Sequence, residues 1–203
     1  MDRKGFLKKA SLAAIAVSTF GTVLGNGEKF TGDCETTNDI LGPFYRPDAP
    51  TRQDLTYNDL KGVRIALKGK VFGADCTTPL KGALVEIWHC DTEGNYDNES
   101  GDFLQRAQWK TNKKGWYAFY TILPGKYLNG RQYRPAHIHF RVTAPGHKEL
   151  ISQIYFQGDP HIEDDPWASD ERAKLRILPI SLEDTNGNLA VNFDIFLAES
   201  SGR

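Results

Sequence analysis

The sequence lacks an excess of charge of either sign, since its 25 Lys and Arg residues nearly balance its 26 Asp and Glu residues. The basic residues are scattered, and they form no stripe of the kind that follows a phosphate backbone. Nucleic acid is therefore not an expected partner. Methionine is nearly absent as well, with one residue, which fits a well-defined core better than an adaptable Met-lined surface.

An apolar run long enough to cross a membrane is also missing. The run at 10–24 is shorter than the roughly 20 apolar residues that span a bilayer. It follows a start rich in Arg and Lys, so residues 1–25 are predicted to be a cleaved export signal. Residues 3–8 resemble a twin-arginine motif with Lys in the second basic position, and an ordinary secretion signal is the alternative. We expect an exported chain, periplasmic or extracellular, without membrane contact after signal removal.

Cysteine is scarce, with three residues, and two of them could pair in an oxidising compartment. Cys34 and Cys76 lie in polar, loop-like surroundings, whereas Cys90 ends an apolar stretch. This pattern favours a Cys34–Cys76 disulfide with Cys90 as a buried thiol. Three free thiols are the alternative.

Helical periodicity is nearly absent, and from Arg64 onward apolar residues recur with a period of two. We predict an all-β fold, an antiparallel β-sandwich over 63–200, with long loops and one short helix at 170–178 capped by Ser169 or Asp170. Residues 26–62 are predicted to be an irregular arm, because prolines interrupt them. The main predicted strands are 83–90, 116–122, 136–142, 151–156 and 191–197.

Two histidines form the sharpest local pattern. On a strand, residues i and i+2 face the same way, so His137 and His139 present two imidazoles side by side, with Ile138 and Phe140 turned into the core. Such a pair suits a metal but is weak evidence alone. The other histidines are predicted to be surface or hydrogen-bonded residues: His89, His147 and His161.

The spacing of residues in the sequence does not identify the other ligands of such a metal. A carboxylate such as Glu86 or Asp91 would complete a zinc site and suggest a hydrolase. Tyr96 and Tyr127 both follow strands on turns that could direct a side chain into a shared cleft, although a lone Tyr more often serves packing.

Six short runs, in order, carry a specific resemblance: 41–45, 83–88, 94–96, 121–127, 134–140 and 153–160. The stretch 41–197 resembles the intradiol ring-cleavage dioxygenases, the family of protocatechuate 3,4-dioxygenase and catechol 1,2-dioxygenase. This resemblance implies a prealbumin-like sandwich core and one non-haem Fe(3+) per chain, with four ligands: Tyr96, Tyr127, His137 and His139.

The resemblance also implies the residues around the substrate. Arg134 and Gln153 match residues that line the family's substrate site, and Leu41, Pro43 and Tyr45 fall where the family builds the pocket wall. Two plainer interpretations stay open. Arg134 could form an ion pair with a nearby carboxylate, and the Gln153 amide could satisfy backbone groups.

The implied ligand set suits the implied reaction in its charge. Iron(III) with two tyrosinates, two neutral imidazoles and a hydroxide has no net charge. A catechol that gives one proton to the hydroxide and one to a tyrosinate leaves the net charge of the site at zero. By resemblance, Tyr127 leaves the metal while Tyr96 stays, and Arg134 stabilises developing negative charge.

The sequence therefore predicts an oxidoreductase of aromatic compound catabolism. It would insert both atoms of O2 into a catechol-type diol, between the hydroxylated carbons, to give muconate-type products. A non-catalytic binding module and the zinc hydrolase are the alternatives. The sequence does not identify which ring is the substrate. A carboxylated substrate would need a cation, for which Arg46, Arg52 and Arg131 are candidates. A homo-oligomer or a partner subunit is equally open.

Overall fold

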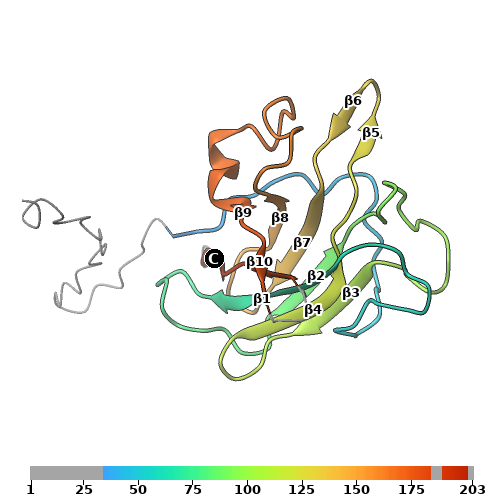
Figure 1. The fold of residues 1–203 in the computed structure, drawn as a ribbon. Coiled ribbons are helices and arrows are strands. Elements are labelled where there is room, and N and C mark those ends of the chain that lie inside the picture. Colours follow the sequence, from blue (N-terminus) through green and yellow to red (C-terminus); the bar gives the residue numbers. More distant parts are fainter. Residues whose placement is uncertain (1–33, 184–188, 201–203) are drawn as a thin grey trace, which may run out of the picture.

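The computed structural model describes residues 34–183 and 189–200, so the predicted export signal lies outside the described residues. Two five-stranded sheets form a sandwich, and a two-stranded hairpin projects from one end (Figure 1). The predicted all-β sandwich is confirmed. Within the described ranges, no helix has the length and apolar character needed to cross a bilayer.

The first sheet is built around the longest strand, β1, which pairs antiparallel with β4 and parallel with β11 and β12. Its strands are β1 Arg64–Phe72, β4 Trp116–Ile122, β10 Ser181–Leu182, β11 Leu189–Asn192 and β12 Ile195–Phe196. The predicted strand 191–197 is thus wrong in one respect, because it is interrupted between β11 and β12. There the Asp194 carboxylate accepts the Lys70 N–H at 2.8 Å. The Phe193 carbonyl also presses so close to Gly69 that a Cβ there would lie 1.9 Å from it.

The second sheet has the order β3-β2-β7-β8-β9, antiparallel except for the last pair. Its strands are β2 Leu84–Trp88, β3 Arg106–Lys110, β7 His137–Thr143, β8 Leu150–Phe156 and β9 Ile177–Leu178. The hairpin consists of β5 Tyr127–Asn129 and β6 Gln132–Arg134. Sequence analysis did not anticipate β3, although Ala107 and Trp109 alternate there with the polar residues Arg106, Gln108 and Lys110.

The core fills the space between the sheets, and every second residue of the central strands contributes to it. Ile138 and Phe140 of β7 are fully buried there, as predicted, and they meet Phe119 and Phe193 of the facing side. The other face of the second sheet is therefore left for the polar residues between them. This face carries both histidines.

The predicted helix at 170–178 is shorter and tighter than expected. It is a 3-10 helix, Glu171–Arg176, and Asp170 caps it by accepting the Arg172 N–H at 2.8 Å. Ile177 is extended and pairs with Tyr155, so the chain joins the second sheet before a longer helix can form.

The N-terminal arm, the described residues 34–62, covers the polar face of the second sheet. It runs across β8 and β7 toward β2 and β3, drawn in blue in Figure 1. A disulfide joins Cys34 at its start to Cys76 in the β1–β2 loop, which is the pairing favoured by the sequence, and Cys90 is free and buried.

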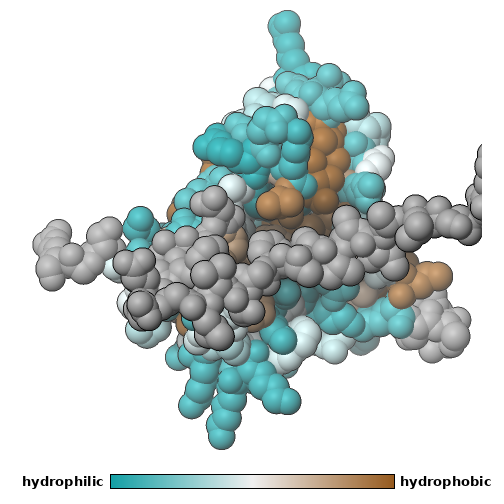
Figure 2. Space-filling model, turned by 90° about the vertical axis from the view of Figure 1, so that its left-hand side faces the viewer, coloured by the Kyte–Doolittle hydropathy of each residue, from teal (hydrophilic) through white to brown (hydrophobic). Residues whose placement is uncertain are grey.

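Buried polar contacts fix the arm further along. The Asp39 carboxylate accepts hydrogen bonds from Tyr155 at 3.0 Å and Arg176 at 2.7 Å. One side of the molecule is mainly hydrophilic, with a narrow apolar strip in its upper half (Figure 2).

Candidate metal centre

The two histidines of β7 lie side by side on the polar face of the second sheet. Both are about 1 % exposed, and their ring centroids are 4.9 Å apart. His137 Nδ1 lies 2.7 Å from the Pro135 carbonyl. Since a carbonyl can only accept, Nδ1 carries the proton and Nε2 keeps a free lone pair.

Two interlocked turns bring the tyrosines to these histidines. Gly94, at φ +90°, packs so tightly that a Cβ would lie 2.5 Å from the Lys126 carbonyl and 3.0 Å from Tyr127 Cβ. Glycine is required there by both the positive φ and the close approach. As a result the Tyr96 and Tyr127 ring centroids are 5.6 Å apart.

The four side chains converge at one place. The Tyr96 hydroxyl lies 3.4 Å from His137 Nε2, and the Tyr127 ring centroid is 5.6 Å from that of His137. The Tyr96 and His139 centroids are 6.3 Å apart. The structure therefore brings together all four residues that the resemblance implied as ligands.

Burial shifts the pKa values of three of these side chains. It lowers the pKa of His137 to about 3 and the pKa of His139 well below its usual value, so both imidazoles are neutral near pH 7. Burial also raises the pKa of Tyr96 well above 10, while the charges of Arg134 and Arg106 act in the opposite direction. Both imidazoles can thus act as neutral electron-pair donors, and burial favours the neutral form of the Tyr96 phenol.

Arg134 lies beside this cluster, as the cross-strand partner of Tyr127 in the hairpin. Its guanidinium makes two contacts with the Asp165 carboxylate, at 2.7 and 3.2 Å, and both side chains are almost fully buried. It also lies 4.3 Å from the centre of the Trp167 ring and donates to the Tyr155 hydroxyl at 3.3 Å. Arg134 therefore forms an ion pair with a carboxylate, as one of the two interpretations predicted. If Arg134 also contacts a substrate, it does so while paired with Asp165.

Gln153 sits opposite His139 in the β7–β8 register and is fully buried. Its amide donates to the Ile40 carbonyl at 3.0 Å and to the Asp39 carboxylate at 3.3 Å. It thus satisfies groups of the arm, which is the plainer of the two interpretations that the sequence left open.

The predicted pocket-wall residues of the arm lie in two places. Leu41 and Pro43 flank Gly42, where a Cβ would come within 3.0 Å of the His139 ring. Tyr45 lies farther along, its ring 5.0 Å from Trp88 and its hydroxyl bonded to Glu86 at 3.0 Å.

Sequence analysis missed Phe44. Its ring stacks on Tyr96 at 4.2 Å and meets the edge of Tyr127 at 5.9 Å. It is the arm residue that contacts both phenols, and no spacing rule would have selected it.

The zinc alternative is not supported. Glu86 is held by Tyr45 and by Arg141 at 2.9 Å, and the Asp91 carboxylate accepts the N–H groups of its own turn. Within 34–183 and 189–200, no three His, Cys, Asp or Glu side chains could share a metal ion.

The three other histidines have separate partners, as predicted. His89 contacts the Cys90 carbonyl and Thr121 Oγ1, both at 2.8 Å, while His147 contacts the Pro145 carbonyl. His161 lies 3.1 Å from the Lys126 amine.

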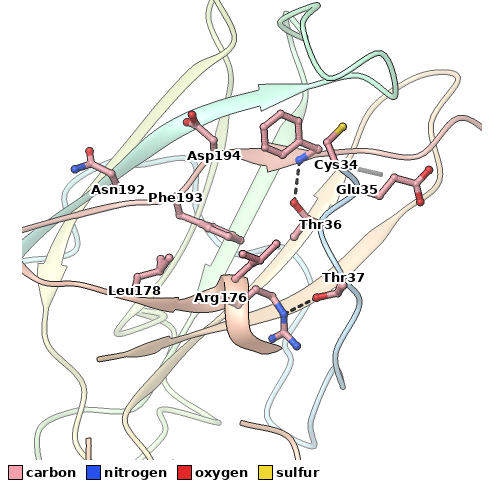
Figure 3. Close-up of a pocket in the computed structure, with 11 residues that line it drawn as sticks. Cys34, Glu35, Thr36, Thr37, Arg176, Leu178, Asn192, Phe193 and Asp194 are labelled. Carbon is pink, nitrogen blue, oxygen red and sulfur yellow. Dashed lines mark hydrogen bonds between the residues drawn. The ribbon is translucent and has the colours of Figure 1, made fainter. Parts of the chain in front are cut away.

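A separate cavity of about 180 Å³ lies where the arm begins, between Cys34, Leu178 and Phe193 (Figure 3). Arg176 donates to the Thr37 hydroxyl at its edge. None of the four converging side chains lines this cavity. It belongs to the anchoring of the arm.

Comparisons with known proteins point to one enzyme family. The family model Dioxygenase_C, described as dioxygenase, matches residues 40–199, which include the four converging side chains. The chain is 32% identical over 188 residues to chlorocatechol 1,2-dioxygenase of Rhodococcus opacus, covering 80% of this chain and 72% of the relative. It is 36% identical over 150 residues to catechol 1,2-dioxygenase 2 of Acinetobacter lwoffii, covering 64% and 54%.

Among solved structures, the dioxygenase domain of a dioxygenase carbohydrate-binding protein fusion from Streptomyces sp. SirexAA-E superposes with a TM-score of 0.70. The identity is 31%, and the match covers 82% of this chain and 99% of that domain. The chain spans about half the length of the catechol 1,2-dioxygenases of the two Acinetobacter species. Taken together, the matched residues and the shared fold show that the chain belongs to the intradiol ring-cleavage dioxygenase family.

Proposed function

We propose that this chain is a non-haem iron(III) dioxygenase that opens catechol-type rings between the two hydroxylated carbons, using O2 and giving muconate-type products. The observation that carries the proposal is the convergence of two phenols and two neutral imidazoles, with the Tyr96 hydroxyl 3.4 Å from His137 Nε2. Relatives named as catechol and chlorocatechol 1,2-dioxygenases support the same reaction class.

The donor set fits a ferric ion. Phenolate oxygens suit a hard trivalent cation, and His137 holds its proton on Nδ1, so Nε2 is available. His139 Nδ1 is buried without a partner among the described residues, in keeping with a site that a bound group completes. Tyr96, Tyr127, His137 and His139 would hold the ion, which supplies Lewis acidity that ionises phenols and activates a bound diol toward oxygen.

The surrounding residues have separate tasks in this proposal. Once ionised by the bound ion, the Tyr127 oxygen would accept one of the two protons of the incoming diol, and a hydroxide would take the other. Arg134, fixed by Asp165 and Trp167, orients the substrate beside Tyr127. The arm, through Gly42 and Phe44, covers the histidines and phenols and keeps water away from them.

We further propose an uncharged ring as the preferred substrate, because two of the three candidate cations are engaged elsewhere and the third lies at the hairpin tip. Arg46 pairs with Asp97 and lies over the Phe103 ring, and Arg52 donates to three main-chain carbonyls, including that of Arg106 at 2.9 Å. Arg131 is an exposed residue at the hairpin tip. A carboxylated ring such as protocatechuate would meet no unengaged cation at Arg46 or Arg52.

We also propose that the chain is exported. The Cys34–Cys76 disulfide supports this, because disulfides persist in oxidising compartments, and the basic and apolar start of the sequence supports it independently.

The test is oxygen uptake by the purified, iron-loaded full chain with catechol, chlorocatechol, hydroxyquinol and protocatechuate, with product identification. We expect a coloured protein, since ferric tyrosinate absorbs visible light, together with muconate-type products and protocatechuate as the poorest substrate. A colourless protein without oxygen uptake would contradict the reaction and favour a binding module. Equal rates with protocatechuate would contradict only the proposed ring.

A further inference from the structure

Arg106, the first residue of β3, is a buried cation with an unusual set of partners. It is 1 % exposed, yet it forms no ion pair with any carboxylate in the described part of the chain. The other two buried arginines, Arg134 and Arg176, are paired with Asp165 and Asp39. A buried charge without a counter-ion is costly and needs a reason.

The partners of Arg106 are neutral acceptors in two separate segments. Nε donates to the Asp97 carbonyl at 2.8 Å, Nη1 to the Phe44 carbonyl at 2.5 Å, and Nη2 to Asn98 Oδ1 at 3.1 Å. Asp97 directly follows Tyr96, and the Phe44 ring stacks on Tyr96 with an interplanar angle of 19°. One guanidinium therefore fixes both the backbone after Tyr96 and the ring that covers it.

The loop between Tyr96 and Arg106 has a conformation that lets Arg106 make these hydrogen bonds. The Asp97 carboxylate accepts the N–H groups of Ser100 at 2.9 Å and Leu104 at 2.7 Å. Phe103 and Gln105 hold φ values of 51° and 52°, a conformation that costs energy outside glycine. Such a loop persists only where its surroundings over-determine it.

Tyr127 is held differently. It belongs to the three-residue strand β5, whose neighbour Leu128 is 55 % exposed, and the hairpin pairs with neither five-stranded sheet. The two phenols thus differ in mechanical support: Tyr96 is clamped from two sides, and Tyr127 sits at the base of a projecting hairpin.

We infer that Arg106 is a positioning residue that holds Tyr96 in place as the fixed phenol ligand, acting through the Asp97 and Phe44 carbonyls. The inference rests on the proposed function for its metal readout. Its geometric part concerns the chain alone.

The experiment compares Arg106→Met, Arg106→Lys and Arg52→Met in the full iron-loaded chain. Arg52 is the matched control, because it donates to carbonyls of the same loop, at Asp102, Phe103 and Arg106, but contacts neither Asp97 nor Phe44. We expect Arg106→Met to weaken or shift the visible tyrosinate band and to lower kcat by roughly tenfold to a hundredfold, with a smaller change in KM. Arg106→Lys should recover part of the band, and Arg52→Met should keep it.

A folded Arg106→Met protein with the wild-type band and kcat would overturn the inference. If Arg106→Met does not fold, Phe44→Leu decides in its place: it removes the stacked ring, and an unchanged band would overturn the inference. If the wild-type chain binds no iron, the proposed function is wrong. The positioning role of Arg106 can then still be tested by amide hydrogen exchange of residues 96–100. Faster exchange in Arg106→Met than in Arg52→Met supports the clamp, and equal exchange refutes it.

Discussion

Removing the Cys34–Cys76 disulfide should lower the free energy of unfolding by about 4 kcal/mol. The bond joins residues 42 positions apart, and it ties the arm to the β1–β2 loop of the sandwich. In the chain-entropy description, closing a loop of that length removes about 13 cal/mol/K from the unfolded chain, which is about 4 kcal/mol at 25 °C. Since domains of this kind are stable by roughly 5–15 kcal/mol, the loss would be a large part of the total.

The assay is thermal and guanidinium unfolding of the wild type and of the Cys34→Ser, Cys76→Ser double variant, each with and without a reductant. For a chain of this size we expect the midpoint to fall by roughly 8–16 °C in the double variant and in the reduced wild type. The reductant should leave the double variant unchanged, because Cys90 is then the one remaining cysteine of the chain and is buried as a free thiol.

Two results would refute this reasoning. A double variant within about 1 kcal/mol of the wild type would show that the bond does not constrain the unfolded chain as its loop length requires. A reduced wild type that matches the oxidised one, with both thiols titrated as free, would show that the arm is held by its other contacts alone. The other contacts of the arm include the buried ion pair between Asp39 and Arg176, whose charged groups lie 2.7 Å apart.

Four further outcomes are expected. Tyr127→Phe should retain iron but bind catechol more weakly, lowering kcat/KM about a hundredfold; unchanged oxygen uptake would remove Tyr127 from the mechanism. His139→Ala should lose most of its iron by elemental analysis, and full metal content would contradict its role as a ligand. Asp165→Asn leaves the buried Arg134 guanidinium without its counter-ion, and it should cost roughly 3–5 kcal/mol in guanidinium unfolding; a cost near zero would argue against that pairing. Burial holds the pKa of His89 at about 4 against 6.5 unfolded, so the contribution of His89 to stability should fall by about 1.4 kcal/mol per pH unit between pH 6.5 and 4, in addition to the contributions of other buried histidines. The His89→Gln variant should show a shallower slope there, and identical slopes would contradict the assignment.

Much of the sandwich could be predicted because its strands follow a simple period. The alternation that buries Ile138 and Phe140 also predicts that His137 and His139 face the other way. The break between β11 and β12 could not be predicted, because it depends on Asp194 replacing a ladder partner for Lys70, 124 residues away. The short 3-10 helix has the same kind of cause, since β9 competes for the residues that would have extended it.

The candidate site was predictable only in part. Tyr96 and Tyr127 came from resemblance, and the physical feature that joins their turns is Gly94, which a single sequence presents as one glycine among 19. The partner of Arg134 was foreseen as a carboxylate but not as Asp165, since no local rule relates residues 31 positions apart. The neutral partners of Arg106 were not foreseen at all.

The arrangement of the second sheet explains why these residues meet. Register places Arg106 opposite Trp88, Trp88 opposite His139, and His139 opposite Gln153, so one row across four strands carries a buried cation, a packed ring, the proposed ligand and the residue that contacts the arm. The Trp88 ring lies parallel to His139 at 4.9 Å within that row. A slip of one residue in any of these strands would turn its polar group into the core. The register of the sheet therefore fixes His139 and its neighbours, whereas Tyr127 lies in the hairpin, which pairs with neither five-stranded sheet.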